Sequence, residues 1–161
     1  MIKKKLASLL ISITPKKIKQ IYSFELNYKI EAKFKFSQLA YSQEGEDLVL
    51  NRLFDNKHDG FYVDVGANHP LRFSNTHFFY KKGWRGVNIE PNPELHEVLQ
   101  DIRKEDANIN LGVSTEKGEL DYYMFNEPAL NTFSKKEADE YLFKQEYSLI
   151  KKCKVKVDTL E

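Results

Sequence analysis

The segment Phe61–Val65 restricts the fold of this chain more than any other feature. It is an apolar run interrupted by a single acid, and it follows the breaker pair Asp59-Gly60. Such a run predicts a strand that is buried on both faces, as the strands of parallel sheets are. Neighbouring parallel strands need a crossover connection between them, which is usually a helix. The sequence after Val65 must therefore supply helices and strands in alternation.

The following segments meet this requirement. A short helix is expected over Asn75–Lys82, ended by Gly83, and a second helix is expected to start at Asn92-Pro93-Glu94, which combines an N-cap with proline at the first helical position. The expected strands are residues 61–65, 86–90 and 108–113. This alternation predicts an α/β fold built from parallel βαβ units with right-handed crossovers.

Segments on either side of this core also carry local signals. Residues 44–54 have apolar side chains at helical period, and Lys117-Gly118 is expected to turn the chain into a β-hairpin arm at 119–125. Ser134–Glu137 has the pattern of a capping box and predicts a helix that runs to about Leu149. Residues 153–158 alternate Cys or Val with Lys, which predicts a final strand with one face in water.

Charge is distributed unevenly along the chain. Residues 1–36 contain nine Lys and two Glu, a net charge of +7, and the whole chain has a formal net charge of +1, so the remainder carries −6. The overall balance argues against a nucleic-acid binder, which needs a concentrated basic surface. The single cysteine, Cys153, excludes an intrachain disulfide and a multi-thiolate metal site, and it fits a reduced, cytoplasmic setting. We name no metal ligands, and the sequence leaves metal dependence open.

The basic N-terminal segment contains an apolar run at residues 6–13. Its large aliphatic side chains lie on one face of a helix, and the run is far shorter than the roughly 20 residues of a membrane-spanning helix. With lysines at both ends, residues 1–19 fit either peripheral contact with the inner face of a membrane or packing on the body or a partner subunit. We divide the chain into a basic N-terminal helix and lead-in at 1–40 and a body at 41–161.

The most informative polar residues follow the first two core strands. Asp64, Gly66 and Asn68 lie at the end of the first strand, and Glu90 ends the second, 24 residues after Gly66. Ligands of open α/β sheets bind beyond the carboxyl ends of the strands, where a glycine permits a sharp turn. An acid after the second strand can accept hydrogen bonds from both ribose hydroxyls of a nucleoside. The pattern therefore predicts a nucleoside site.

Two nucleoside cofactors use this layout. A nicotinamide dinucleotide needs the motif G-x-G-x-x-G for its pyrophosphate, and only the first of these glycines, Gly66, is present. S-adenosylmethionine has no phosphate and needs a tight turn, polar groups and a ribose acid. Asp64, Gly66 and Asn68 suit the looser pattern D-x-G-x-x of methyltransferases. A loop and an acid that bind no ligand are the alternative.

Six short motifs follow one another in the body of the chain: Tyr41–Asp47, Asp64–Pro70, Phe73–Thr76, Gly83-Trp84, Asn88–Pro93 and Gly112–Ser114. In order and spacing they resemble the FkbM-family methyltransferase domain, and the likeness runs from about Tyr41 to Glu161. The resemblance implies a Rossmann-like class I fold that binds S-adenosylmethionine. It also implies O-methylation, often of a sugar or another small hydroxyl-bearing substrate.

The resemblance implies roles for individual residues as well. Those that would bind S-adenosylmethionine are Asp64, Gly66, Ala67, Asn68, Glu90, Pro91, Asn92, Ser42 and Gln43. The first four would line the methionine part, Glu90 would hold the ribose, and Pro91 or Asn92 would border the adenine. Ser42 and Gln43 would close over the cofactor. No catalytic base is implied; His69 has the right pKa range for one, but a loop histidine before proline is more often structural.

The family pattern continues beyond Glu161 into another core strand with an acid-glycine motif. The resemblance therefore implies that this chain has an incomplete C-terminal half and that Phe61–Val65 has an unpaired edge. We expect the 161-residue chain to self-associate and to show no methyl transfer on its own. A split enzyme with its other half on a second polypeptide, and a non-catalytic Rossmann-like interaction module, are the alternatives.

Overall fold

The computed structural model describes residues 38–144 and 146–161. The predicted N-terminal helix and its contact with a membrane or partner lie outside these residues and stay predictions, as does the boundary at residue 40. By its internal contacts the chain divides into two units, Met1–Leu39 and Ala40–Glu161. The helices and strands of the described residues belong to the second unit.

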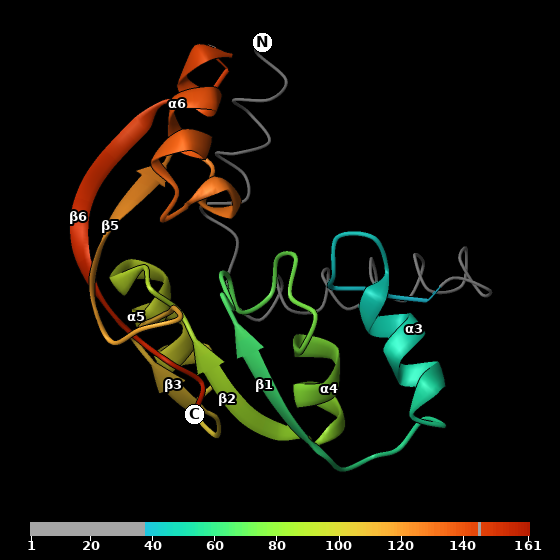
Figure 1. Ribbon diagram of the computed structural model, residues 1–161. Helices are drawn as coiled ribbons and strands as arrows, with labels where there is room; N and C mark the ends of the chain where they lie inside the picture. The colour runs from blue at the N-terminus through green and yellow to red at the C-terminus, as the bar shows by residue number, and fades with distance from the viewer. Residues whose placement is uncertain (1–37, 145) are drawn as a thin grey trace, which may run out of the picture. The chain divides into compact units, whose positions relative to one another are not determined.

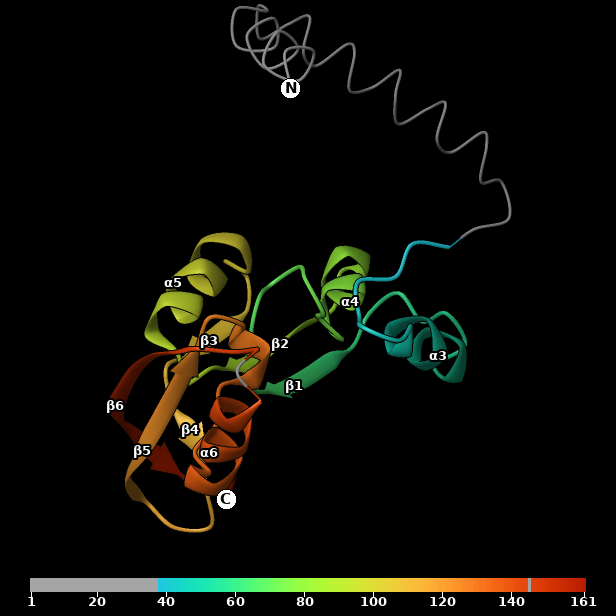
Figure 2. The ribbon, with the colours of Figure 1, turned by 90° about the horizontal axis from the view of Figure 1, so that it is seen from above.

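Within the described residues, three strands form a parallel sheet in the order β1-β2-β3: β1 is Phe61–Val65, β2 is Arg85–Ile89 and β3 is Ala107–Ile109. Helix α4 (His77–Lys82) connects β1 to β2, and α5 (Pro93–Ile102) connects β2 to β3 (Figure 1). Both helices lie on the same side of the sheet (Figure 2). The predicted α/β, Rossmann-like arrangement of βαβ units is confirmed.

Local signals in the sequence account for the ends of these helices. The side-chain oxygen of Asn92 accepts a hydrogen bond from the Glu94 amide at 3.0 Å, which caps α5 behind its first-turn proline. Gly83 ends α4 with a φ of 106°, a conformation that glycine adopts without steric cost. Helix α3 (Glu46–Leu53) forms within the predicted range 44–54.

The predicted strand at 108–113 is wrong as a single element. Its first part belongs to β3, and its last part is β4 (Gly112–Val113), which lies in a second sheet. Between them, the side-chain amide of Asn110 donates to the carbonyls of Glu90 and Pro91 at 2.8 and 3.2 Å. These bonds tie the chain to the loop after β2 and end its pairing in the first sheet.

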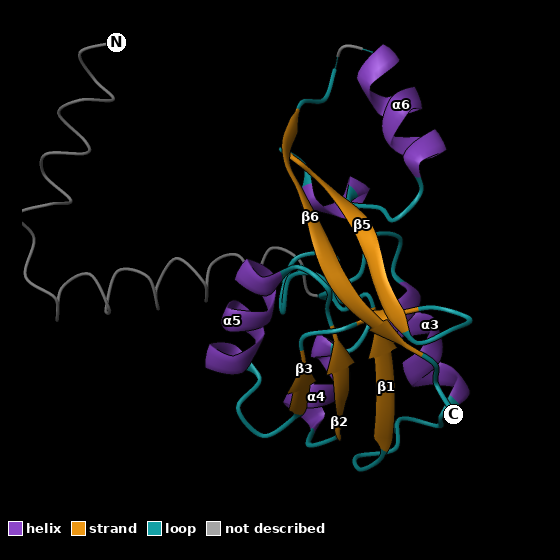
Figure 3. Ribbon diagram, turned by 60° about the vertical axis from the view of Figure 1, so that its left-hand side comes forward, coloured by secondary structure: helices purple, strands orange, loops and turns teal. Residues whose placement is uncertain are grey.

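The second sheet has the order β4-β6-β5 among the described residues, with β5 at Gly118–Phe125 and β6 at Leu149–Asp158. Strands β5 and β6 are antiparallel and form a long arm (Figure 3). The arm predicted at 119–125 is therefore present, but its partner is distant in sequence. The intervening chain contains the 3-10 helix η1 (Pro128–Leu130) and helix α6 (Lys135–Phe143).

Helix α6 ends earlier than the predicted Leu149. The backbone amide of Ser148 donates to the side chain of Asn126 at 2.9 Å, and the Asn126 amide donates to the Ser148 carbonyl at 3.1 Å. These bonds close the end of the β5–β6 pair, so Leu149 starts a strand. Along β6 the lysines are exposed and Val157 is buried, which confirms the predicted alternation.

One face of β1 is uncovered, contrary to the prediction of a strand buried on both faces. Phe61, Val63 and Val65 are 67%, 54% and 48% exposed. The two connecting helices lie on the opposite face, and no other element of the described residues covers these side chains. Strand β1 is also an edge strand of its sheet as far as the structure describes it.

His77, at the start of α4, is buried with its ring 4.4 Å from that of Tyr41 in an edge-on arrangement. Its Nδ1 has no hydrogen-bond partner in the described part of the chain. Burial, followed by the positive charges of Arg103 and Lys81, lowers the pKa of His77 to about 4. The ring is therefore neutral in the folded protein at neutral pH.

Acidification is expected to destabilise the fold through His77. The pKa of His77 is about 6.5 in the unfolded chain and about 4 in the folded one. Between these two pH values the unfolded state binds more protons than the folded state, so the free energy of unfolding decreases as the pH is lowered. His77→Phe keeps the ring contact and should flatten this dependence in thermal unfolding measured between neutral pH and about pH 4. The exposed His58, changed to Gln, is the control. An unchanged slope in the His77 variant would contradict the prediction.

Candidate functional site

The loops that follow β1 and β2 lie side by side at the carboxyl edge of the first sheet. The amides of Gly66 and Ala67 both donate to the carbonyl of Ile89, at 2.8 and 3.2 Å. Gly66 has a φ of 72°, and a Cβ atom added at this position would meet no heavy atom within 4 Å apart from those of its two chain neighbours. The turn is therefore tight, and it faces open space into which a ligand can fit.

Glu90 joins these two loops. Its Oε2 accepts a hydrogen bond from the Asn68 amide at 2.7 Å, and its Oε1 accepts one from the Asn92 amide at 2.8 Å. The residue is only 3% exposed. Burial raises the pKa of Glu90, and the two amide bonds oppose this increase. Each carboxylate oxygen has a second lone pair, so Glu90 can hold both loops and still accept a ligand hydroxyl.

Asp64 lies in β1, on the face that the helices cover. The hydroxyl of Thr76 donates to Asp64 Oδ2 at 2.7 Å, and no hydrogen bond within the described residues reaches Oδ1. Burial raises the pKa of Asp64, whereas the Thr76 hydrogen bond and the charge of Arg103 lower it. One oxygen of this carboxylate is thus fixed by the protein, and the other can bind a ligand.

Pro91 and Asn92 lie after β2, and both are buried. The Asn92 side-chain oxygen caps α5, so this residue has a structural role irrespective of any ligand. A cavity of about 340 Å³ opens beside Pro91 and is also lined by Asn110, Cys153 and Lys156. The predicted adenine-side residue Pro91 therefore borders a real hollow, whose opposite wall comes from the β5–β6 arm. The sequence carried no signal for that wall, because the arm is distant in the chain.

Ser42 and Gln43 are not joined to these loops by any hydrogen bond of the described residues. The Ser42 hydroxyl donates to Asp47 Oδ1 at 2.7 Å, and Asp47 is completely buried. The neighbouring Tyr41 packs against His77 of α4. Gln43 is exposed. This part of the chain shapes the entry to α3 and its contact with α4.

His69 has a structural role in the loop after β1. Its Nδ1 accepts hydrogen bonds from the amides of Leu71 and Arg72 at 3.1 and 3.0 Å. Burial, with a smaller effect of the Arg72 charge, lowers the pKa of His69. Because Nδ1 is an acceptor in the neutral ring, the proton lies on Nε2, and neither nitrogen is free to take a proton from a substrate hydroxyl.

A buried polar network lies beneath the site, and sequence reasoning missed it. The side chains of Arg103 and Asp106 are both completely buried, with Arg103 Nη1 3.4 Å from Asp106 Oδ2. Asp106 also accepts hydrogen bonds from the Tyr62 hydroxyl at 2.6 Å and the Gly86 amide at 2.9 Å. One signal was available, because Arg103 follows the buried Leu99 by four positions and so continues the apolar face of α5.

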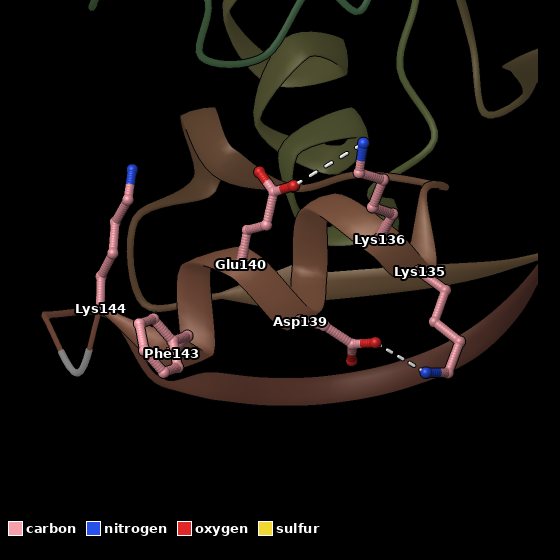
Figure 4. A pocket seen from close by; sticks show the side chains of 6 residues that line it. All are labelled: Lys135, Lys136, Asp139, Glu140, Phe143 and Lys144. Carbon is pink, nitrogen blue, oxygen red and sulfur yellow. Dashed lines mark hydrogen bonds and ion pairs between the residues drawn. The ribbon is translucent and has the colours of Figure 1, made fainter.

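A second hollow lies far from these loops in the sequence, on the outer face of α6 (Figure 4). Its charged side chains are paired one helical turn apart, Lys135 with Asp139 at 2.7 Å and Lys136 with Glu140 at 4.0 Å. Phe143 at its end is 88% exposed. Exposed i,i+4 pairs of this kind are typical of a solvated helix surface, so we assign no binding site to this hollow.

Within residues 38–144 and 146–161, no group of three or more His, Cys, Asp or Glu side chains is arranged to hold a metal ion. No helix in this part of the chain combines the length and the apolar character needed to cross a bilayer.

A parallel sheet with a glycine turn after β1 and a buried acid after β2 is an arrangement that many nucleoside-binding α/β proteins share. A comparison with known protein families shows which family has this arrangement here: residues 64–161 of the chain match the Methyltransferase FkbM domain. The chain therefore belongs to the FkbM methyltransferase family, which confirms the resemblance. The match does not include Tyr41–Asp47. No curated protein and no solved structure matches the chain.

Proposed function

We propose that this protein transfers the methyl group of S-adenosylmethionine to a hydroxyl oxygen of a saccharide or another small molecule. The observation that carries the proposal is the position of Glu90, a buried acid that joins the two loops at the carboxyl edge of the sheet, beside an open glycine turn. In a chain of a methyltransferase family, this edge is the natural place for the cofactor.

The residues at this edge fit the chemical groups of S-adenosylmethionine. Asp64 Oδ1 would bind the ammonium of the methionine part, since a carboxylate prefers a cationic donor. The remaining lone pairs of Glu90 would accept the two ribose hydroxyls. The cavity beside Pro91 would take the adenine. Among the described residues, no hydrogen bond joins Ser42 or Gln43 to the loops after β1 and β2, so we assign these two residues no role in binding.

The cofactor, when bound, supplies a methyl group on a sulfonium; transfer forms the new O–CH₃ bond, breaks the S–CH₃ bond and releases the hydroxyl proton. The contribution of this chain is alignment. The turn at Gly66 and the acid Glu90 would hold the donor in one orientation, and holding two reactants in line removes several kcal/mol of the barrier, on the order of 7–11 in the best cases. No side chain at the edge is assigned as the base.

Replacing Glu90 by Ala tests the proposal. Equilibrium dialysis with methyl-labelled S-adenosylmethionine should give weak, saturable binding by the 161-residue chain, and Glu90→Ala should weaken it by about 1.5–3 kcal/mol, or roughly ten- to 150-fold. Thermal stability should fall too, because the amides of Asn68 and Asn92 lose their acceptor. Glu97→Ala, an exposed acid on α5, should change neither quantity. Lower stability with unaltered affinity would leave Glu90 a structural role only.

The exposed face of β1 favours a second candidate function. An apolar face at a sheet edge is typical of a surface that binds another polypeptide. The chain would then be a non-catalytic interaction module, or one half of an enzyme whose other half is a second chain. Saturable binding of S-adenosylmethionine separates a half-enzyme from an interaction module, because only the former needs the cofactor edge.

A further inference from the structure

Arg103 and Thr76 connect the buried polar network to the cofactor edge. The Nη2 group of Arg103 donates to Thr76 Oγ1 at 3.2 Å and to Ser74 Oγ at 3.0 Å. Because Thr76 Oγ1 accepts from Arg103, its single hydrogen is left to donate, and it does so to Asp64 Oδ2 at 2.7 Å. The chain of donors therefore runs in one direction, from the guanidinium through the hydroxyl to the carboxylate.

The guanidinium of Arg103 is held in one position by burial and by its hydrogen bonds. It is completely buried, its Nη1 donates to the Tyr62 hydroxyl at 2.9 Å, and its Nε donates to the Pro70 carbonyl at 3.3 Å. The guanidinium thus holds both β1 and the segment that leads from the glycine turn to α4. A planar group with its donors all occupied keeps one orientation, and Thr76 is fixed with it.

We propose that Thr76 and Arg103 are positioning residues, which hold the Asp64 carboxylate with Oδ1 directed to the ammonium group of the cofactor. The proposal rests on the function proposed above, and it adds a role for two residues that touch no cofactor themselves. The segment 70–76 then does more than connect β1 to α4: its last residue selects which carboxylate oxygen is left for the ligand.

The charges around Asp64 give the proposal a measurable consequence. Burial raises the pKa of Asp64, while the Thr76 hydrogen bond and the Arg103 charge lower it; the Asp106 charge raises it slightly. The charge of Asp64 in turn raises the pKa values of two other titratable groups, Tyr62 in β1 and Glu90 after β2. Loss of the Thr76 donor should therefore raise the pKa of Asp64. The protonated acid cannot pair with an ammonium, so binding would fail at a higher pH than in the unchanged protein.

The test is the pH dependence of S-adenosylmethionine binding, measured by equilibrium dialysis on the 161-residue chain. Thr76→Val should move the midpoint of the acid limb upward by about one pH unit, the equivalent of one charge-assisted hydrogen bond. Thr76→Ser keeps the hydroxyl and should restore the original midpoint. Arg103→Lys, where it folds, should move the midpoint in the same direction as Thr76→Val, because a lysine cannot keep the forked contacts.

Ser74→Ala is the matched control, because Ser74 accepts from the same Nη2 group but makes no hydrogen bond to Asp64 among the described residues. It should lower thermal stability and leave the midpoint unchanged. A Thr76→Val protein with lowered stability and an unchanged midpoint would overturn the positioning role and make the network purely structural. Absence of saturable binding by the unchanged chain would instead refute the cofactor assignment itself, so the two failures can be told apart.

Discussion

Asp106→Asn is expected to remove much of the stability of the fold. The substitution keeps the size of the side chain but leaves the Arg103 charge buried without its carboxylate, a change that costs about 3–5 kcal/mol. The NH₂ group of the new asparagine would also face either the Tyr62 hydroxyl or the Gly86 amide. Both of these groups donate to Asp106, so a donor would then face a donor and one hydrogen bond would be lost. Total stabilities of domains are about 5–15 kcal/mol.

Thermal unfolding followed by circular dichroism measures this effect. A loss of that size should lower the melting temperature by roughly 10 °C or more, or prevent folding at 37 °C. Asp101→Asn removes an exposed acid of α5 and should have little effect. A melting temperature for Asp106→Asn within a few degrees of the unchanged protein would contradict the view that this ion pair holds α5 on the sheet.

Self-association through β1 is the second large expected effect. The strand has its apolar face exposed and an unpaired edge within the described residues, and such edges pair with other chains. Sedimentation velocity on the 161-residue chain should therefore detect oligomers. Phe61→Lys places a charge at the amino end of this strand, away from the carboxyl end where we propose that the cofactor binds. It should weaken association by about 2 kcal/mol, roughly thirty-fold.

Phe143→Lys provides the control for this experiment. Phe143 is more exposed than Phe61, at 88% against 67%, but it lies on α6 and not on a sheet edge. If backbone pairing drives association, this variant should behave as the unchanged chain does. Dissociation by Phe143→Lys and not by Phe61→Lys would place the contact on α6 and refute the role of β1.

The elements that were predicted correctly are those whose structure depends on residues close to them in the sequence. The turn at Gly66 follows from the backbone freedom of glycine, and the start of α5 follows from an N-cap at Asn92. Strand β1 is an apolar run interrupted only by Asp64, and a helix and a second strand follow it in the sequence, an alternation that is typical of a parallel sheet.

The errors concern residues whose partners are distant in sequence. Residues 108–113 have a uniform strand pattern, but the bonds from Asn110 to the loop after β2 divide them between two sheets. The predicted helix to Leu149 competes with pairing at Asn126, and the pairing prevails because it completes the β5–β6 arm. Propensity is a weak prior where tertiary contacts compete with it.

The sequence by itself determined the class of fold, the family and the two acids at the carboxyl edge, because period, caps and short motifs are local properties of a chain. Only the tertiary structure decided how those acids are used. Glu90 joins two loops through amides that lie 22 residues before it and two residues after it, and Asp64 is held by a donor chain that starts at Arg103. Hydrogen-bond partners are selected by proximity in space, and burial makes each unmade bond costly, so these roles exist only once the fold has formed.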